Sequence, residues 1–253
     1  MKKNKKAKTS FSIEGFVNAK VKARGPILYY LRDFDVLYDI YSIYWKVEYN
    51  GKIFLVDTGI KDIDYINIST KGGHKWERTD DIKKFEKVDY IFPTHLHYDH
   101  CSGIFDYDEA KIILTDETYK NLFEEKYNFL YKENIYNSKI LEKVKECNGD
   151  RFIIIGDGKE IIKGVSTHWV GGHTPCSQAI IFESDFNYKD KDFKGFLFAG
   201  DIIFTNKNIS EKIPGGLFYN LLDFYSFYDK FKESGFMIVP GHDGEAVKIL
   251  NNL

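Results

Sequence analysis

The chain of 253 residues lacks the features that mark several specialised protein classes. Its three cysteines, Cys101, Cys147 and Cys176, form no Cys-x-x-Cys pair, which favours reduced thiols over a disulfide framework. No apolar run approaches the roughly 18 residues of a membrane-spanning helix. The net charge is only −2, which does not favour a protein dedicated to nucleic acids or membranes. Five prolines and 20 glycines without a period exclude a collagen-like chain.

Hydrophobic residues make up 43% of the chain and aromatic residues 17%, which excludes disorder as its main state. Basic residues gather at the start, where residues 1–32 carry nine Lys or Arg and one acid. The segment 1–10 has the charges of a signal peptide without its apolar region. We therefore expect a disordered basic N-terminus over residues 1–10, a single domain over residues 11–253 and a cytoplasmic location.

The order of apolar segments predicts an α/β protein. Asn50-Gly51 lies between two strand-like segments and is a strong signal for a hairpin, because a type I′ turn needs positive φ at both central residues. The remaining pattern predicts strands, then helices, then strands and helices again, with helices outside two strand-rich halves. This order favours a four-layer αβ/βα sandwich. Helices are expected over residues 80–87, 116–134 with Asp116 as the cap, the segment ending near Cys147, and 219–234.

Three of the seven histidines lie in T-H-L-H-Y-D-H, residues 94–100, directly after a buried-strand pattern. Alternate strand residues share a face, so His95 and His97 point the same way. Asp99 and His100 follow in the turn. Neutral imidazoles and a carboxylate suit Zn²⁺, and also iron or manganese.

Three further apolar strands each end in a potential ligand: His173 in G-G-H-T, Asp201 in A-G-D and His242 in P-G-H-D. Strand ends present residues to a shared crevice. The full set is enough for two four-coordinate metal ions that share Asp201 and a bridging hydroxide. It consists of His95, His97, Asp99, His100, His173, Asp201 and His242.

Other polar residues near these motifs are expected to have structural roles. Asp57 in V-D-T-G is expected to orient the ligands rather than bind a metal. His74 and His168 are expected to lie outside the site. Cys101 and Cys176 are expected to fill small buried spaces.

With these motifs in this order, the chain resembles the metallo-β-lactamase superfamily. The resemblance implies an αβ/βα sandwich with a dinuclear site between its sheets. It implies that one metal is bound by three histidines, that the second is bound by two histidines and an aspartate, and that Asp201 bridges them. The implied sets are His95, His97 and His173 for the first metal, and Asp99, His100 and His242 for the second.

Within the superfamily the chain most resembles the N-acyl-homoserine lactonases. Asp201 argues against the antibiotic-hydrolysing members, which generally lack the bridging aspartate. Only ten residues follow P-G-H-D, whereas glyoxalase II enzymes add a helical domain there. The chain departs from the lactonases at Phe204, where they typically carry a tyrosine that contacts the substrate carbonyl. Phe204 has no hydroxyl, so Tyr98 or Tyr219 is the candidate replacement.

The expected function is therefore the opening of a small lactone, or the cleavage of an ester, by metal-bound hydroxide. The expected cofactors are two divalent metal ions, most simply Zn²⁺. Asp99 and Asp201 are the expected catalytic residues. Quorum quenching would be the biological role. Two alternatives stay open: a phosphodiesterase, although no basic cluster flanks the ligands, and an iron-dependent oxidoreductase, although no flavin domain is appended. A non-catalytic binding module is disfavoured because every expected ligand is present. The native metal, the substrate and a homodimeric state stay open.

Overall fold

The computed structural model describes residues 10–69, 75–127, 136, 138–146 and 151–253. The expected basic N-terminus falls almost entirely on residues 1–9, which lie outside the described residues, as do His74 and Cys147. Within the described residues, no helix is long and apolar enough to cross a membrane.

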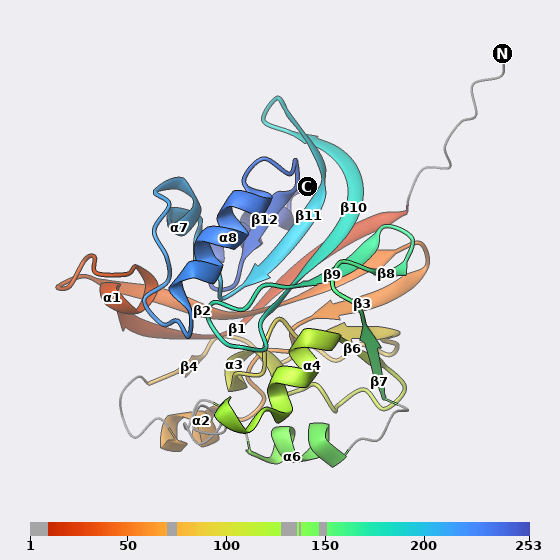
Figure 1. Ribbon diagram of the computed structural model, residues 1–253, viewed down its shortest axis with the longest axis horizontal. Helices are drawn as coiled ribbons and strands as arrows, with labels where there is room; N and C mark the ends of the chain where they lie inside the picture. The colour runs from red at the N-terminus through yellow and green to blue at the C-terminus, as the bar shows by residue number, and fades with distance from the viewer. Residues whose placement is uncertain (1–9, 70–74, 128–135, 137, 147–150) are drawn as a thin grey trace.

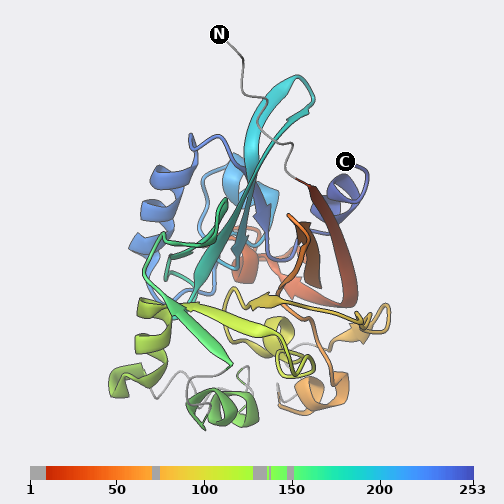
Figure 2. The same cartoon turned by 90° about the vertical axis from the view of Figure 1, so that its right-hand side faces the viewer.

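Two mixed sheets face each other, and helices lie on the outside (Figures 1 and 2). One sheet has seven strands in the order β4-β1-β2-β3-β5-β6-β7, and the other has five in the order β12-β11-β10-β9-β8. The strands are β1 (Phe11–Arg24), β2 (Leu37–Tyr49), β3 (Lys52–Val56), β4 (Glu77–Arg78), β5 (Tyr90–Phe92), β6 (Lys111–Thr115), β7 (Phe152–Ile155), β8 (Glu160–Ile162), β9 (Val165–Trp169), β10 (Gln178–Tyr188), β11 (Lys191–Gly200) and β12 (Met237–Pro240). The helices are α1 (Gly25–Leu28), α2 (Ile63–Ser69), α3 (Tyr98–Cys101), α4 (Asp116–Phe123), the 3₁₀ turn η1 (Glu125–Tyr127), α6 (Ser138–Glu146), α7 (Asn206–Ser210), α8 (Leu221–Phe231) and α9 (Gly244–Leu250).

The alternation of side chains along β3 separates two apolar layers. Phe54 and Val56 point into the cluster between the sheets, whereas Leu55 joins the cluster under α4 and α6. On the opposite side of the molecule, α8 covers the five-stranded sheet through a third cluster that includes Phe224 and Phe227. The order of layers is helix, sheet, sheet, helix, so the predicted four-layer sandwich is confirmed.

The hairpin predicted at Asn50-Gly51 is also confirmed. The two residues adopt φ values of 49° and 76°, and they join β2 to β3 in an antiparallel pair. Asparagine and glycine tolerate positive φ better than other residues, so this dipeptide fixes the register of the pair.

Three local expectations differ from the structure. Residues 80–87 form no helix, because tertiary contacts hold the segment: the Lys83 backbone N–H donates to the Tyr44 hydroxyl, and Phe85 packs against Phe16. The cap of α4 is Thr115 rather than Asp116, since the Thr115 hydroxyl accepts the hydrogen bond from the backbone N–H of Thr118.

That helix also ends earlier than expected, at Phe123, and is followed by the short turn η1. The last part of the expected helix, residues 128–134, lies outside the described residues. The strand β1, which pairs with β2 along most of its length, was not among the strands expected from the sequence.

Gln178 ties the two sheets together with a fully buried amide. Its Nε2 donates to the carbonyls of Pro93 and Ile113, at 2.8 and 2.9 Å, and its Oε1 accepts from the backbone N–H of Thr115 at 2.9 Å. Gln178 belongs to β10, and its partners belong to the opposite sheet or follow its strands. The amide therefore holds the end of β5, from which the 94–100 segment begins.

Replacing this amide by an apolar side chain of similar size is expected to be costly. Gln178→Leu leaves two carbonyls and one N–H buried without their partner, at about 1–3 kcal/mol for each group. We expect the free energy of unfolding in urea to fall by about 3 kcal/mol or more. The control, Asn187→Ala, removes an exposed hydrogen bond to Asp192 and should stay within about 0.5 kcal/mol of the parent. A loss below about 1 kcal/mol for Gln178→Leu would contradict a structural role for the tie.

Candidate metal centre

All the candidate ligands lie just beyond the C-terminal ends of strands. The 94–100 segment follows β5, His173 follows β9, Asp201 follows β11 and His242 follows β12. Because β3 and β5 run parallel, as do β11 and β12, these ends meet at one edge of the sandwich. The structure brings together side chains that are separated by up to about 150 positions in the sequence.

Within the described residues, the side chains form three groups whose potential ligand atoms lie within 4.8 Å of one another. Two of them have the same members as the two expected ligand sets, and the third joins the sets through Asp201. The groups are His95, His97 and His173; His95, His100 and Asp201; and Asp99, His100 and His242.

Asp201 lies between the two halves of the site. Its Oδ2 is 2.9 Å from His242 Nε2 and 3.5 Å from His173 Nε2, and its Oδ1 is 3.3 Å from His100 Nε2. One carboxylate therefore faces histidines of both halves, which is the position expected of a bridging ligand.

Hydrogen bonds on the outer side of the rings fix where three of the histidines carry their proton. The Nδ1 atoms of His173 and His242 lie 2.7 Å from the carbonyls of Leu217 and Tyr41. A carbonyl only accepts, so each Nδ1 is a donor. His100 Nδ1 likewise donates to Asp57 at 2.8 Å. When each of these rings is neutral, its inward Nε2 therefore carries no proton and has a free lone pair.

Burial and charge divide the site into two halves. Burial lowers the pKa values of His95, His97 and His173, so these three imidazoles are neutral. Burial also acts to lower the pKa of His100, but the nearby carboxylates, Asp201 first, outweigh it and hold that pKa well above its ordinary value. The pKa of His242 is raised in the same way by Asp201. The second half therefore attracts positive charge.

The residues fit a pair of metal ions. Asp201 Oδ1 is buried without a hydrogen-bond partner among the described residues. In the first group, the Nε2 atoms of both His95 and His173 lie 2.9 Å from His97 Nδ1, which can donate a proton to only one of them at a time. Bound cations would coordinate both Asp201 Oδ1 and the nitrogen lone pairs that converge on the same space. Imidazole nitrogen and carboxylate oxygen suit Zn²⁺, iron and manganese.

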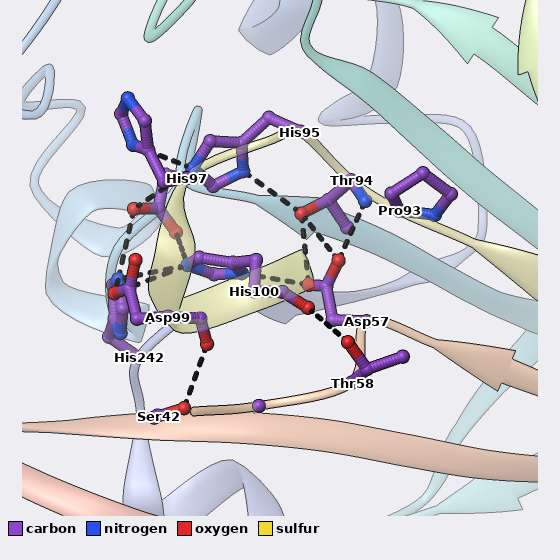
Figure 3. Close-up of polar contacts among 12 residues, drawn as sticks. Ser42, Asp57, Thr58, Pro93, Thr94, His95, His97, Asp99, His100 and His242 are labelled. Carbon is purple, nitrogen blue, oxygen red and sulfur yellow. Dashed lines mark hydrogen bonds and ion pairs between the residues drawn. The ribbon is translucent and has the colours of Figure 1, made fainter. Parts of the chain in front are cut away.

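Asp57 orients one histidine in each half of the site (Figure 3). Its carboxylate accepts from the backbone N–H of Thr94 at 2.7 Å and from His100 Nδ1 at 2.8 Å. The Thr94 hydroxyl donates to Asp57 at 2.9 Å and lies 3.1 Å from His95 Nδ1, so it accepts the proton of that ring. Asp57 holds this position with φ of 60°, an unusual backbone conformation for a non-glycine residue. The relay role of Thr94 was missed, although Thr94 precedes His95 directly.

Glycine is required in the turn that presents His173. Gly172 has φ of 74°, and a Cβ there would lie 2.0 Å from Ile202 Cδ1. Its N–H donates to the carboxylate of Asp223, at the start of α8, at 3.0 Å. Asp223 is another contact that the sequence did not reveal, because 51 positions separate it from Gly172.

The three residues considered for substrate binding lie in different environments. Phe204 is buried, with its ring stacked on His242 at 5.5 Å and perpendicular to His173 at 5.4 Å. Tyr98 is buried too, and its hydroxyl accepts from the backbone N–H of Asp62. Tyr219 is 40% exposed. Only Tyr219 of the three is accessible from solvent.

Among the described residues, the remaining histidine and the two cysteines lie outside the three groups. His168 lies on β9 and packs against Phe231. Cys101 and Cys176 carry free thiols and are buried in the apolar cluster on the outer side of the seven-stranded sheet. Burial raises the pKa of Cys176 to about 11, which makes its thiol unreactive at neutral pH.

Comparisons with known proteins agree with this geometry. The family model described as the metallo-beta-lactamase superfamily matches residues 41–227. An N-acyl homoserine lactonase from Bacillus cereus is 28% identical over 134 residues, which are 52% of this chain and 45% of that protein. The match thus spans less than half of the length of that relative.

Solved structures share the fold over nearly the whole chain. An N-acyl homoserine lactone hydrolase with N-hexanoyl-L-homoserine at its catalytic metal centre superposes with a TM-score of 0.72 at 19% identity, covering 96% of both chains. A dizinc quorum-quenching lactonase superposes with a TM-score of 0.63 at 13% identity, covering 92% of this chain and 88% of that one.

Metal removal is expected to lower the stability of the folded protein. Zinc at a free concentration 100-fold above its dissociation constant adds about 2.7 kcal/mol for each site, because the unfolded chain cannot converge these ligands. For a domain of this size that is a rise in Tm of roughly 5–10 °C per site, measured by scanning calorimetry of chelator-treated protein with and without Zn²⁺. Mg²⁺, which prefers oxygen ligands, is the control and should shift the Tm far less. Equal shifts with the two ions would contradict a nitrogen-rich site.

Asp57→Asn tests whether this carboxylate orients both halves. An asparagine has one acceptor where Asp57 uses two, so either His100 or Thr94 loses its partner. We expect zinc affinity to fall roughly 10- to 100-fold in a competition titration with a chromophoric chelator. Asp35→Asn, at an exposed aspartate, makes the same change away from the site and should leave the affinity unchanged. Parental affinity in Asp57→Asn would rule out the orienting role.

Proposed function

The chain belongs to the metallo-beta-lactamase superfamily, and we propose that it is a dinuclear metal-dependent hydrolase that opens a lactone ring. The observation that carries the proposal is the carboxylate of Asp201, which lies between two groups of converging ligand atoms and has a buried oxygen in need of a partner.

We assign the seven side chains as the resemblance implies. His95, His97 and His173 would hold one metal ion, and Asp99, His100 and His242 would hold the other, with Asp201 shared. Two such ions, when bound, make water acidic enough to attack at neutral pH and polarise the carbonyl under attack. Zinc is the simplest choice for this mixture of nitrogen and oxygen donors.

The two carboxylates have different positions and therefore different tasks. Asp201 is 4% exposed and keeps the two halves at a fixed separation, and its Oδ1 is free to take a proton from the attacking water. Asp99 is the most exposed of the seven ligands, with 16% of its side chain accessible. It is therefore the carboxylate that would meet the substrate, and the proton that Asp201 takes from the water would be returned to the departing alkoxide.

An apolar rim beside His173 supports a substrate that carries an acyl chain. Leu217, whose carbonyl orients His173, is 49% exposed, and the next two residues, Phe218 and Tyr219, are 38% and 40% exposed. Leu217 and Phe218 line a small hollow that reaches His173 and Asp201. An N-acyl homoserine lactone, which combines an acyl chain with a ring ester, fits this arrangement and agrees with the names of the relatives. Tyr219 would contact this substrate, whereas Phe204 supports the imidazoles from behind.

The decisive experiment is proton release when zinc-loaded protein meets a medium-chain N-acyl homoserine lactone. We expect release well above the spontaneous rate, and a loss of at least about 100-fold in Asp201→Asn, because that change removes the shared charged ligand and the proton acceptor. Asp35→Asn is the control and should keep the parental rate.

The metal content is measured for each variant, so that the loss of an ion is separated from the loss of the proton acceptor. No release with two metal ions bound would overturn the lactonase assignment. Turnover of a phosphodiester, or oxygen uptake by iron-loaded protein, would then identify one of the two alternative activities.

A further inference from the structure

We propose that Ser42 on β2 is a positioning residue that sets the affinity of the second metal ion, the one held by Asp99, His100 and His242. This inference rests on the proposed function, since it concerns one of the two proposed ions.

Ser42 completes the hydrogen bonding of a helix that cannot complete its own. The helix α3 is four residues long, so its carbonyls lack partners within the helix. The Ser42 hydroxyl donates to the carbonyl of Asp99 at 2.8 Å (Figure 3). Gly103, whose N–H would reach Asp99 in a longer helix, donates instead to the hydroxyl of Thr58 at 3.0 Å. The short helix α3 and the turn that follows it are therefore held by hydrogen bonds to residues outside them, Ser42 and Thr58.

The neighbouring residue of β2 contacts the same half of the site. The carbonyl of Tyr41 accepts from His242 Nδ1 at 2.7 Å. Two consecutive residues of one strand thus hold two members of one ligand group, Asp99 and His242. Ser42 is itself fully buried, and it pairs with Ala19 where β1 carries a bulge. Bulges are common beside functional sites, where they direct a side chain.

Among the described residues, the Asp99 carboxylate has no hydrogen bond that would fix its orientation directly. Its Oδ2 lies 3.7 Å from the Nε2 atoms of both His100 and His242, and no donor among the described residues forms a hydrogen bond with its carboxylate. Its orientation therefore comes from its own backbone, which Ser42 holds at the carbonyl. Among the described residues, no hydrogen bond joins Ser42 to His95, His97 or His173, so the effect should be confined to one metal ion.

The test is a zinc titration of Ser42→Ala against a chromophoric chelator, together with metal counting after dialysis. We expect the dissociation constant of one zinc equivalent to rise roughly tenfold while the other stays at the parental value. The matched control is Thr167→Val, which also removes a buried hydroxyl that donates to a backbone carbonyl, that of Ala179, away from the site. It should bind both equivalents as the parent does. Ser42→Thr keeps the donor and should restore most of the affinity.

The outcomes separate this inference from the proposed function. If the parent binds two equivalents and Ser42→Ala binds both with parental affinity, Ser42 has no positioning role and the dinuclear proposal stands. If Ser42→Ala weakens both equivalents alike, the effect is a general loss of structure and the inference fails. If the parent itself binds fewer than two equivalents, the dinuclear proposal fails and this inference fails with it.

Discussion

The site depends on hydrogen bonds that turn buried imidazoles so that their lone pairs face one another. Backbone carbonyls hold the outer nitrogens of His173 and His242, and Asp57 holds that of His100. Lone pairs repel when nothing lies between them, so this arrangement is stable only with cations or protons in the middle. The surrounding structure offsets this repulsion by holding the imidazoles rigidly in place. The supports include the hydrogen bonds of Gln178 between the sheets and the left-handed backbone conformation of Asp57.

The two halves of the site meet this constraint differently. The half with His95, His97 and His173 contains neutral rings, whose pKa values burial lowers. The other half adds carboxylates, which raise the pKa values of His100 and His242 and stabilise positive charge there. Without a metal ion, protons supply this charge, so metal binding in the second half must displace them. Its affinity should therefore depend more steeply on pH than that of the first half.

The convergence of the candidate ligands was predictable from sequence because its signals are local. The Asn50-Gly51 turn and the ligands that follow apolar strands depend on a few adjacent residues, and the structure confirms the turn and brings the ligands together. The supports were not predictable, because each is a contact between distant positions. Ser42 is only a small polar residue in a strand pattern, and its partner Asp99 lies 57 positions away. The prediction of a helix over residues 80–87 was wrong for the same reason, a contact between distant positions. The Tyr44 hydroxyl accepts the hydrogen bond from the Lys83 N–H, which a helix would use for its own backbone.

In the rim beside His173, different atoms of the same residues would serve the proposed metal site and the proposed choice of substrate. Leu217 contributes its backbone carbonyl to His173, and Gly172 accepts from the backbone N–H groups of Tyr219 and Asn220. These contacts use main-chain atoms, so they do not depend on which side chains stand at positions 217–219. The exposed side chains of Leu217, Phe218 and Tyr219 can therefore change while the orientation of His173 is kept. In the proposed enzyme, substrate choice and metal binding would therefore depend on different atoms of the same short segment. The ligand set would then define the reaction more closely than it defines the molecule acted upon.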